Sequence, residues 1–88
     1  MSAEVEIYTT MYCPYCWRAK DLLSAKSVDF VEIDVGAEPE RRREMMDRSA
    51  GGRTVPQIFI NGTPVGGSDE LHALDRQGKL DPMLAGAA

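Results

Sequence analysis

Apolar and polar side chains alternate along residues 4–9, and this period of two residues predicts a β-strand. Residues 30–35 are rich in β-branched side chains and predict a second strand. Two further apolar runs, 54–60 and 63–65, lie on either side of an Asn-Gly pair. Because both residues of that pair tolerate positive φ, the arrangement indicates a β-hairpin. A proline in the second run cannot donate to a neighbouring strand, so we expect that run at an edge of the sheet.

Between the first two strands, the spacing of apolar residues predicts a helix that begins at Pro14 and breaks near residues 27–29. Proline fits the first helical turn, because the N–H that it lacks would have no helical partner there. The apolar residues that suit the face packed on the sheet are Trp17, Leu22 and Leu23. We interpret the tryptophan as a partly buried packing residue, and the alternative is an aromatic wall that shapes access for protein substrates.

Two more helices are predicted along the rest of the chain. One opens at Pro39 and ends at residues 50–52, which include two glycines. The other begins with Ser68 as N-cap, carries acidic residues in its first turn, and is stopped by Gly78. The expected core residues of these two helices are Met45, Met46, Leu71 and Leu74.

These elements follow the order β-α-β-α-β-β-α, which is a βαβ unit followed by a helix and a hairpin. We therefore expect an α/β fold, a four-stranded mixed sheet flanked by helices on both faces. A chain of 88 residues can build only one core, so a single domain over residues 1–88 is expected. Residues 81–84 favour a short final turn, and residues 85–88 favour a frayed tail.

Composition narrows the class of function. Hydrophobic residues make up 43% of the chain and charged residues 27%, which is typical of a globular protein. A net charge of −4 argues against general nucleic-acid binding, and the basic run 41–43 is surrounded by acidic residues, as on a solvated helix face. No signal peptide and no apolar run of roughly 20 residues is visible, so we expect a cytoplasmic location and no membrane contact. We also expect a monomer.

Cys13 and Cys16 are separated by two residues at a predicted strand-to-helix junction. This spacing is typical of a redox pair, and structural disulfides are uncommon in the cytosol. The N–H groups at a helix start favour a thiolate at Cys13, which would attack a disulfide, and Cys16 would resolve the mixed disulfide. The alternatives are two buried hydrophobic cysteines or half of a zinc site. A structural zinc site usually has four protein ligands, and the single histidine, His72, is expected to be an exposed helical residue.

The chain resembles the dithiol glutaredoxins from about Val5 to Leu84. The motifs that carry the resemblance are Cys13-Pro14-Tyr15-Cys16, Thr54-Val55-Pro56 and Gly66-Gly67-Ser68-Asp69. The resemblance implies a thioredoxin-like fold, glutathione as the electron-donating cosubstrate and no metal. The glutathione-binding residues that it implies are Tyr15, Arg53, Thr54, Val55, Pro56, Gly67, Ser68 and Asp69.

Each part of the implied glutathione site has a physical interpretation. The resemblance implies that Pro56 is cis and lies against the active cysteine, and that the backbone of Val55 pairs with the cysteinyl part of glutathione. Ser68 and Asp69 would receive the γ-glutamyl end, because a helix N-terminus attracts anions and a carboxylate can accept from an ammonium group. Simple helix capping is an equal alternative for these two residues.

One position departs from the family pattern. Many glutaredoxins carry a lysine three residues before the first cysteine, where this chain has Thr10. We therefore hypothesise that Arg53 supplies much of the missing attraction for the glycine carboxylate of glutathione, with Arg43 as a less certain helper.

The resemblance implies an enzyme that uses glutathione to reduce protein disulfides and to remove glutathione from protein mixed disulfides. One alternative is a redoxin reduced by a thioredoxin reductase and serving a dedicated enzyme. The other is an iron–sulfur cluster carrier, in which Cys13 and glutathione thiolates hold a cluster between two chains. Pro14 and Cys16 argue against the cluster carrier, because the family members best known for it have a single active cysteine.

Overall fold

The computed structural model describes residues 3–85, in which four strands form one mixed sheet with the order β2-β1-β3-β4. The strands are β1 (Val5–Thr9), β2 (Val31–Asp34), β3 (Gln57–Ile60) and β4 (Thr63–Gly66). The pair β1–β2 is parallel, whereas β1–β3 and β3–β4 are antiparallel. The prediction of a four-stranded mixed sheet is confirmed, and the proline-containing strand β4 lies at its edge as expected.

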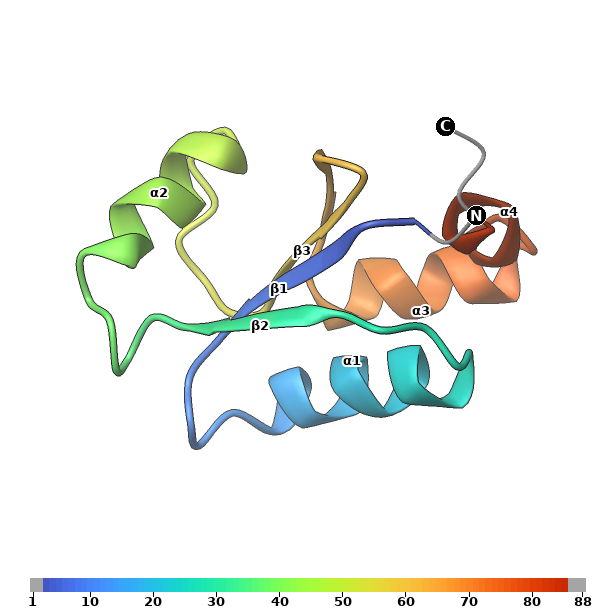
Figure 1. The fold of residues 1–88 in the computed structure, drawn as a ribbon, viewed down its shortest axis with the longest axis horizontal. Helices are drawn as coiled ribbons and strands as arrows, with labels where there is room; N and C mark the ends of the chain where they lie inside the picture. The colour runs from blue at the N-terminus through green and yellow to red at the C-terminus, as the bar shows by residue number, and fades with distance from the viewer. Residues whose placement is uncertain (1–2, 86–88) are drawn as a thin grey trace.

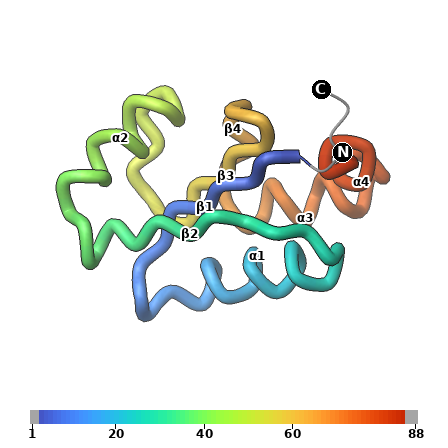
Figure 2. The backbone as a smooth tube through the Cα atoms, viewed as in Figure 1, coloured from blue at the N-terminus to red at the C-terminus, as the bar shows by residue number. Residues whose placement is uncertain are grey.

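Helices cover both faces of this sheet, as the sequence predicts. They are α1 (Pro14–Ala25), α2 (Arg41–Arg48), α3 (Ser68–Arg76) and α4 (Leu80–Leu84). Figures 1 and 2 show α1 and α3 together on one side of the strands and α2 on the other. The short α4 follows α3 and packs beside the start of the chain, where the N–H of Ala3 donates to the C=O of Leu84 at 3.3 Å.

The face covered by α1, α3 and α4 carries the larger apolar core. Alternate residues of β1 and β3 point toward these helices, because side chains of a strand alternate between the two faces of the sheet. The buried members of this cluster are Ala3, Val5, Ile7, Ala19, Leu23, Ile58, Ile60, Leu71, Leu80 and Leu84. Helices α1, α3 and α4 are therefore fixed to the sheet by apolar contacts.

The face covered by α2 carries a smaller core. Its buried members are Tyr8, Ile33, Val35, Met45 and Phe59. The rings of Tyr8 and Phe59 meet edge to face, with centroids 5.6 Å apart and planes inclined by 77°. Only one side chain of α2, that of Met45, is fully buried, so apolar burial alone gives this helix little attachment.

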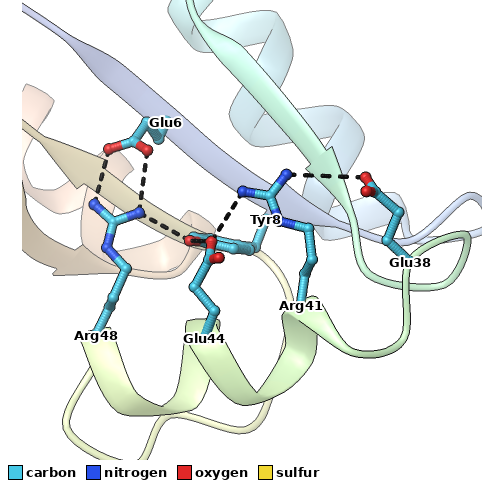
Figure 3. A network of polar contacts seen from close by, with 6 residues as sticks. All are labelled: Glu6, Tyr8, Glu38, Arg41, Glu44 and Arg48. Carbon is cyan, nitrogen blue, oxygen red and sulfur yellow. Dashed lines mark hydrogen bonds and ion pairs between the residues drawn. The ribbon is translucent and has the colours of Figure 1, made fainter.

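Polar contacts add to the attachment of α2, in a network drawn in Figure 3 that we name the α2 clasp. Its members are Glu6, Tyr8, Glu38, Arg41, Glu44 and Arg48. Two nitrogens of the Arg48 guanidinium reach the Glu6 carboxylate at 2.8 and 3.1 Å, and one of them donates to the Tyr8 hydroxyl at 2.8 Å. The same guanidinium lies 4.2 Å from the centre of the Phe59 ring, within the range of a cation–π contact.

The Tyr8 hydroxyl donates to Glu44, which also accepts from Arg41 at 3.0 Å. Burial is the main cause that raises the pKa of Tyr8, followed by its hydrogen bond to Glu44. The hydrogen bonds from Tyr8 and Arg41 lower the pKa of Glu44 from its ordinary value of 4.5. The clasp therefore depends on the charge of a carboxylate that stays ionised to lower pH than a free glutamate does.

Some bounds and exposures differ from the sequence prediction. Helix α2 begins at Arg41, not at Pro39, and it is preceded by turns in which the N–H groups of Arg41 and Arg42 bond three residues back, to Glu38 and Pro39. The N-cap of α3 is Gly67, not Ser68, and the Glu70 carboxylate accepts from the Gly67 N–H at 2.6 Å. The side chain of Trp17 is 47% exposed, because α1 buries the narrow stripe Cys16, Ala19 and Leu23 instead.

The turn predictions are confirmed. Asn61 and Gly62 join β3 to β4 with φ values of 51° and 78°, as an Asn-Gly hairpin requires. Gly78 has a φ of 72° directly after α3, and the next N–H, of Lys79, bonds back to Leu74 at 2.9 Å. Of the predicted frayed tail, residues 86–88 lie outside the described residues. Along residues 3–85, every helix is too short or too polar to span a bilayer.

Candidate active site

Cys13 occupies the N-cap of α1, at the end of the connection that leads from β1. Its backbone is extended, with φ −132° and ψ 99°, and its Sγ accepts the N–H of Cys16 at 3.1 Å. The N-cap is usually filled by a side-chain oxygen that satisfies an unpaired N–H of the first turn. Here a sulfur fills it, and both the N–H and the positive end of the helix stabilise the negative form of that sulfur.

Cys16 lies one turn further along α1 and is more deeply buried. The exposed fraction is 0% for Cys16 and 7% for Cys13, and both are free thiols. The pKa of Cys16 is raised to about 12, mainly by burial and next by its hydrogen bond with Cys13, while the Thr10 backbone and the Lys20 charge act in the opposite direction. Cys16 is therefore a neutral thiol at pH 7, and Cys13 is the sulfur that can react first.

The segment before β3 lies against Cys13. The Val55–Pro56 peptide bond is cis, and the Cys13 thiol lies 3.8 Å from the C=O of Val55. Among residues 3–85, the N–H and C=O of Val55 make no hydrogen bond to another backbone group. Gln57 holds the segment from behind, because its side-chain amide donates to the C=O of Thr54 at 3.0 Å. The backbone of Val55 is thus available to pair with an extended ligand beside the reactive sulfur.

A surface hollow of about 290 Å³ lies between this segment and the start of α3. The residues that line it are Tyr15, Thr54, Val55, Pro56, Gly67, Ser68, Asp69 and Glu70. Every residue that the sequence assigns to glutathione binding lines this hollow, except Arg53. Hollows of about 380 and 390 Å³ lie elsewhere on the surface, but neither is lined by a cysteine or by a neighbour of one.

Glu70 lines the hollow but is absent from the residues that the sequence assigns to it. Its carboxylate bonds to the Gly67 N–H at 2.6 Å, so it closes the N-terminal turn of α3 and adds a negative charge beside Asp69. The sequence does carry a signal for it, since a glutamate three residues after an N-cap is one half of a capping box.

The arginines proposed to replace the missing lysine lie outside the hollow. Arg53 is exposed, and its C=O accepts from the Arg42 side chain at 3.1 Å, which ties this loop to α2. Arg43 is exposed on α2 and pairs with Asp47 at 3.4 Å. A role for either arginine in binding a carboxylate stays a prediction.

The single histidine is not among the residues that line the hollow, and its ring nitrogen contacts Ser68. His72 is half-buried rather than exposed, because its Nδ1 lies 2.8 Å from the C=O of Ser68 and 3.4 Å from the Ser68 hydroxyl. Within residues 3–85, no three histidine, cysteine or acidic side chains gather as a metal site would require. His72 therefore packs against the first turn of α3.

Comparison with protein families places this arrangement among known proteins. The sequence model of the family described as glutaredoxin matches residues 5–65. The chain is 59% identical over 81 residues to a glutaredoxin of Pseudomonas aeruginosa, covering 92% of this chain and 95% of the relative. It is 55% identical over 82 residues to glutaredoxin 3 of Escherichia coli K12, covering 93% of this chain and 98% of the relative.

The fold of the chain is also similar to that of solved glutaredoxin structures. The crystal structure of a buckwheat glutaredoxin–glutathione complex superposes with a TM-score of 0.87 at 31% identity. The match covers 94% of this chain and 77% of the buckwheat chain. The fold described above is thus also that of a solved glutaredoxin.

Proposed function

The chain belongs to the glutaredoxin family, which consists of thiol–disulfide oxidoreductases, and from this premise we propose that it reduces protein disulfides and glutathione mixed disulfides with electrons from glutathione. Cys13 is the attacking thiolate and Cys16 the resolving thiol. The observation that carries the proposal is the position of the Cys13 sulfur. It is capped by the Cys16 N–H and lies 3.8 Å from the Val55 C=O, beside a hollow that suits a small peptide.

The first step is attack of the Cys13 thiolate on one sulfur of a substrate disulfide. A new S–S bond joins Cys13 to that sulfur, and the other substrate sulfur leaves as a thiolate that takes up a proton. When the substrate is a glutathionylated protein, attack on the glutathione sulfur releases the protein thiol. A second glutathione thiolate can then attack the Cys13 mixed disulfide and leave as oxidised glutathione. This route uses Cys13 alone.

Reduction of a disulfide within a protein uses both cysteines. Cys16 loses its proton and attacks Cys13, which releases the reduced protein and leaves a Cys13–Cys16 disulfide. Two glutathione molecules then reduce that disulfide and restore both thiols. The buried, neutral state of Cys16 supports this order of events, because a thiol with a pKa of about 12 does not compete with Cys13 for the first attack.

The hollow offers a partner for each end of glutathione. The backbone groups of Val55 can pair with the cysteinyl residue, which would place the glutathione sulfur next to Cys13. The first turn of α3, at Ser68 and Asp69, presents N–H groups to the γ-glutamyl carboxylate, and the Asp69 carboxylate can accept from the ammonium group. Arg53, next to Thr54, is the candidate for the glycine carboxylate. The proposed partners are therefore glutathione and disulfide-containing or glutathionylated proteins.

The decisive experiment measures NADPH consumption with a small glutathione mixed disulfide as substrate. One assay contains glutathione and glutathione reductase, and the other contains thioredoxin reductase alone. We expect turnover only in the first assay. Turnover only with thioredoxin reductase would contradict the proposal and favour a redoxin that serves a dedicated enzyme, a reading that the threonine at position 10 keeps open.

Cys16→Ser separates the two routes. We expect this variant to retain most deglutathionylation activity and to lose most reduction of a protein disulfide, because glutathione can replace Cys16 only in the first route. Equal loss of both activities would contradict the assignment of roles.

Arg53→Ala tests the proposed contact with the glycine carboxylate of glutathione. The matched control is Arg76→Ala, at the C-terminal end of α3, because only the start of that helix lines the hollow. We expect a several-fold rise in the KM for glutathione in the first variant only. An unchanged KM would remove Arg53 from the site and leave the rest of the proposal standing.

A further inference from the structure

A polar cluster joins α1 to the sheet next to the two cysteines, outside the hollow. We name it the Lys20 cluster, and its members are Thr9, Lys20 and Glu32. One carboxylate oxygen of Glu32 lies 3.0 Å from the Lys20 Nζ and accepts from the Thr9 hydroxyl at 2.8 Å. Thr9 is fully buried, and the Lys20 side chain is only 27% exposed. The ammonium group is thus held toward the sheet rather than extended into solvent.

The geometry relates this ammonium group to Cys16. Lys20 follows Cys16 by four residues on α1, so the two side chains lie on the same side of the helix, one turn apart. Thr9, at the other end of the cluster, directly precedes Thr10, whose backbone contacts Cys16. The cluster therefore adjoins Cys16 on its own helix, through Lys20, and at the end of β1, through Thr9 and Thr10.

We propose that Lys20, oriented by Glu32 and Thr9, is a positioning residue that supports the resolving step through Cys16, by stabilising the Cys16 thiolate once Cys13 is bound in a mixed disulfide. This inference rests on the function proposed above. It assigns a role to the Lys20 ammonium group, which does not line the hollow.

The groups that face Cys16 act differently before and after the first attack. In the reduced protein, burial, the hydrogen bond with Cys13 and the charge of Cys13 all raise the pKa of Cys16. Once Cys13 is bonded to a substrate sulfur, its negative charge and its role as hydrogen-bond partner are lost. The Thr10 backbone and the Lys20 charge, which lower that pKa, remain. Glu32 faces Lys20 and moderates its charge, so the effect of Lys20 is partial rather than complete.

The resolving step forms one S–S bond and breaks another. The Cys16 thiol gives its proton to solvent, and the thiolate attacks the Cys13 sulfur. The bond between Cys13 and the substrate sulfur breaks, and the substrate leaves as a thiolate that takes up a proton. The two cysteines lose two electrons to the substrate disulfide, which becomes two thiols. Lys20 takes part in no bond change, and its contribution is to the free energy of the Cys16 thiolate.

The test is rapid-mixing kinetics of the full chain with a peptide that contains one internal disulfide. The two observables are the rate at which the Cys13 mixed disulfide forms and the rate at which it decays, each measured from about pH 6 to pH 9. In Lys20→Met we expect decay at pH 7 to slow about fivefold, with its pH profile moved to higher pH, and formation to stay unchanged. Lys20→Arg keeps the charge and should restore the decay rate.

Arg18→Met is the matched control, because Arg18 is an exposed cation two residues earlier on the same helix. We expect it to leave the rate and the pH profile of decay unchanged. Decay in Lys20→Met with the pH profile of the wild type would overturn the inference. Equal slowing of formation and decay, not restored in Lys20→Arg, would also overturn it, since that result indicates a structural role.

The assay with the small glutathione mixed disulfide distinguishes this failure from failure of the proposed function. Resolution by Cys16 is not needed there, so Lys20→Met should match the wild type in glutathione-dependent turnover. If the wild type itself fails to turn over with glutathione, the proposed function is wrong. If the wild type turns over with glutathione but Lys20→Met leaves the pH profile of decay unchanged, the inference alone is wrong.

Discussion

The two faces of the sheet hold their helices in different ways. Among residues 3–85, ten buried residues form the apolar cluster under α1, α3 and α4, whereas five form the cluster under α2. The α2 face compensates with the clasp, in which Arg48 and Glu44 bond to side chains of β1. Apolar burial does not depend on protonation, whereas ion pairs and carboxylate hydrogen bonds respond to pH and are screened by salt. The two faces should therefore fail under different conditions.

The candidate site lies across this division. Both cysteines belong to α1 and its N-cap, on the apolar side. The Thr54–Pro56 segment follows α2, and its loop is tied to that helix by the contact of Arg42 with the C=O of Arg53. The sulfur chemistry is thus supported by the apolar face, and one wall of the hollow is supported by the polar face. Mutations on each side measure how far the comparison holds.

The largest effect is expected from Leu23→Ala, which removes a fully buried side chain of α1 from the larger core. Truncation of a buried leucine leaves a cavity, so we expect a loss of about 3 kcal/mol in the free energy of unfolding. Urea unfolding followed by circular dichroism measures it. Leu22→Ala is the matched control. Leu22 is next to Leu23 but only partly buried, so its truncation should reduce the free energy of unfolding much less. Equal losses would mean that the apolar face does not depend on burial as described.

Arg48→Met should have the next largest effect, because it removes the centre of the α2 clasp while keeping an apolar stem. Glu6 loses its partner and Tyr8 loses one of its hydrogen bonds, in a partly buried setting. We expect a loss of about 1.5 kcal/mol, which for a chain of this size lowers Tm by about 6–12 °C. The loss should shrink in high salt. A change as small as that of an exposed arginine on α2 would show that the clasp contributes nothing.

The apolar face was also the more predictable one. The alternation in β1 and the Asn-Gly hairpin are local signals, and the structure follows both. The stripe on α1 was predicted only in part, because its buried positions include Cys16 and Ala19, which carry little apolar signal, while the large Trp17 faces solvent. A pattern of hydrophobic residues finds an element more readily than it finds which of its side chains are buried.

The contacts that tie the clasp to β1 carry no local signal. Arg48 and Glu6 are 42 residues apart, and Glu44 is 36 residues from Tyr8, so these pairings depend on how α2 is placed over the sheet. The same reason limits prediction of the site. Motifs place most residues around the hollow, but the contact of Arg42 with Arg53 and the Lys20 cluster arise only when distant elements pack together.

Glu44→Gln sharpens the comparison through pH. Because the pKa of Glu44 is lowered in the folded protein, the unfolded chain takes up the proton first as pH falls. The stabilisation by this carboxylate is therefore complete above its ordinary value of 4.5 and is lost as pH falls through the lower value of the folded state. Wild type should exceed Glu44→Gln in free energy of unfolding by about 0.5 kcal/mol at pH 7, after allowance for the exposure of Glu44, and the difference should shrink steadily as the pH falls below 4.5. Urea unfolding at several pH values measures this, and a constant difference would contradict it.

The smallest effect is expected from Arg43→Ala, on the same helix as the clasp but facing solvent. Arg43 pairs with Asp47 at 3.4 Å, and their side chains are 80% and 69% exposed. Water screens such a pair, and ordering two long side chains offsets most of the attraction, so Tm should change by less than about 2 °C. Thermal unfolding measured beside Arg48→Met compares two arginines of one helix that differ in burial and partners rather than in charge. A large fall in Tm in Arg43→Ala would mean that α2 is held by its net charge rather than by the specific contacts of the clasp. The two faces of the sheet would then differ in their electrostatic field rather than in the geometry of their contacts.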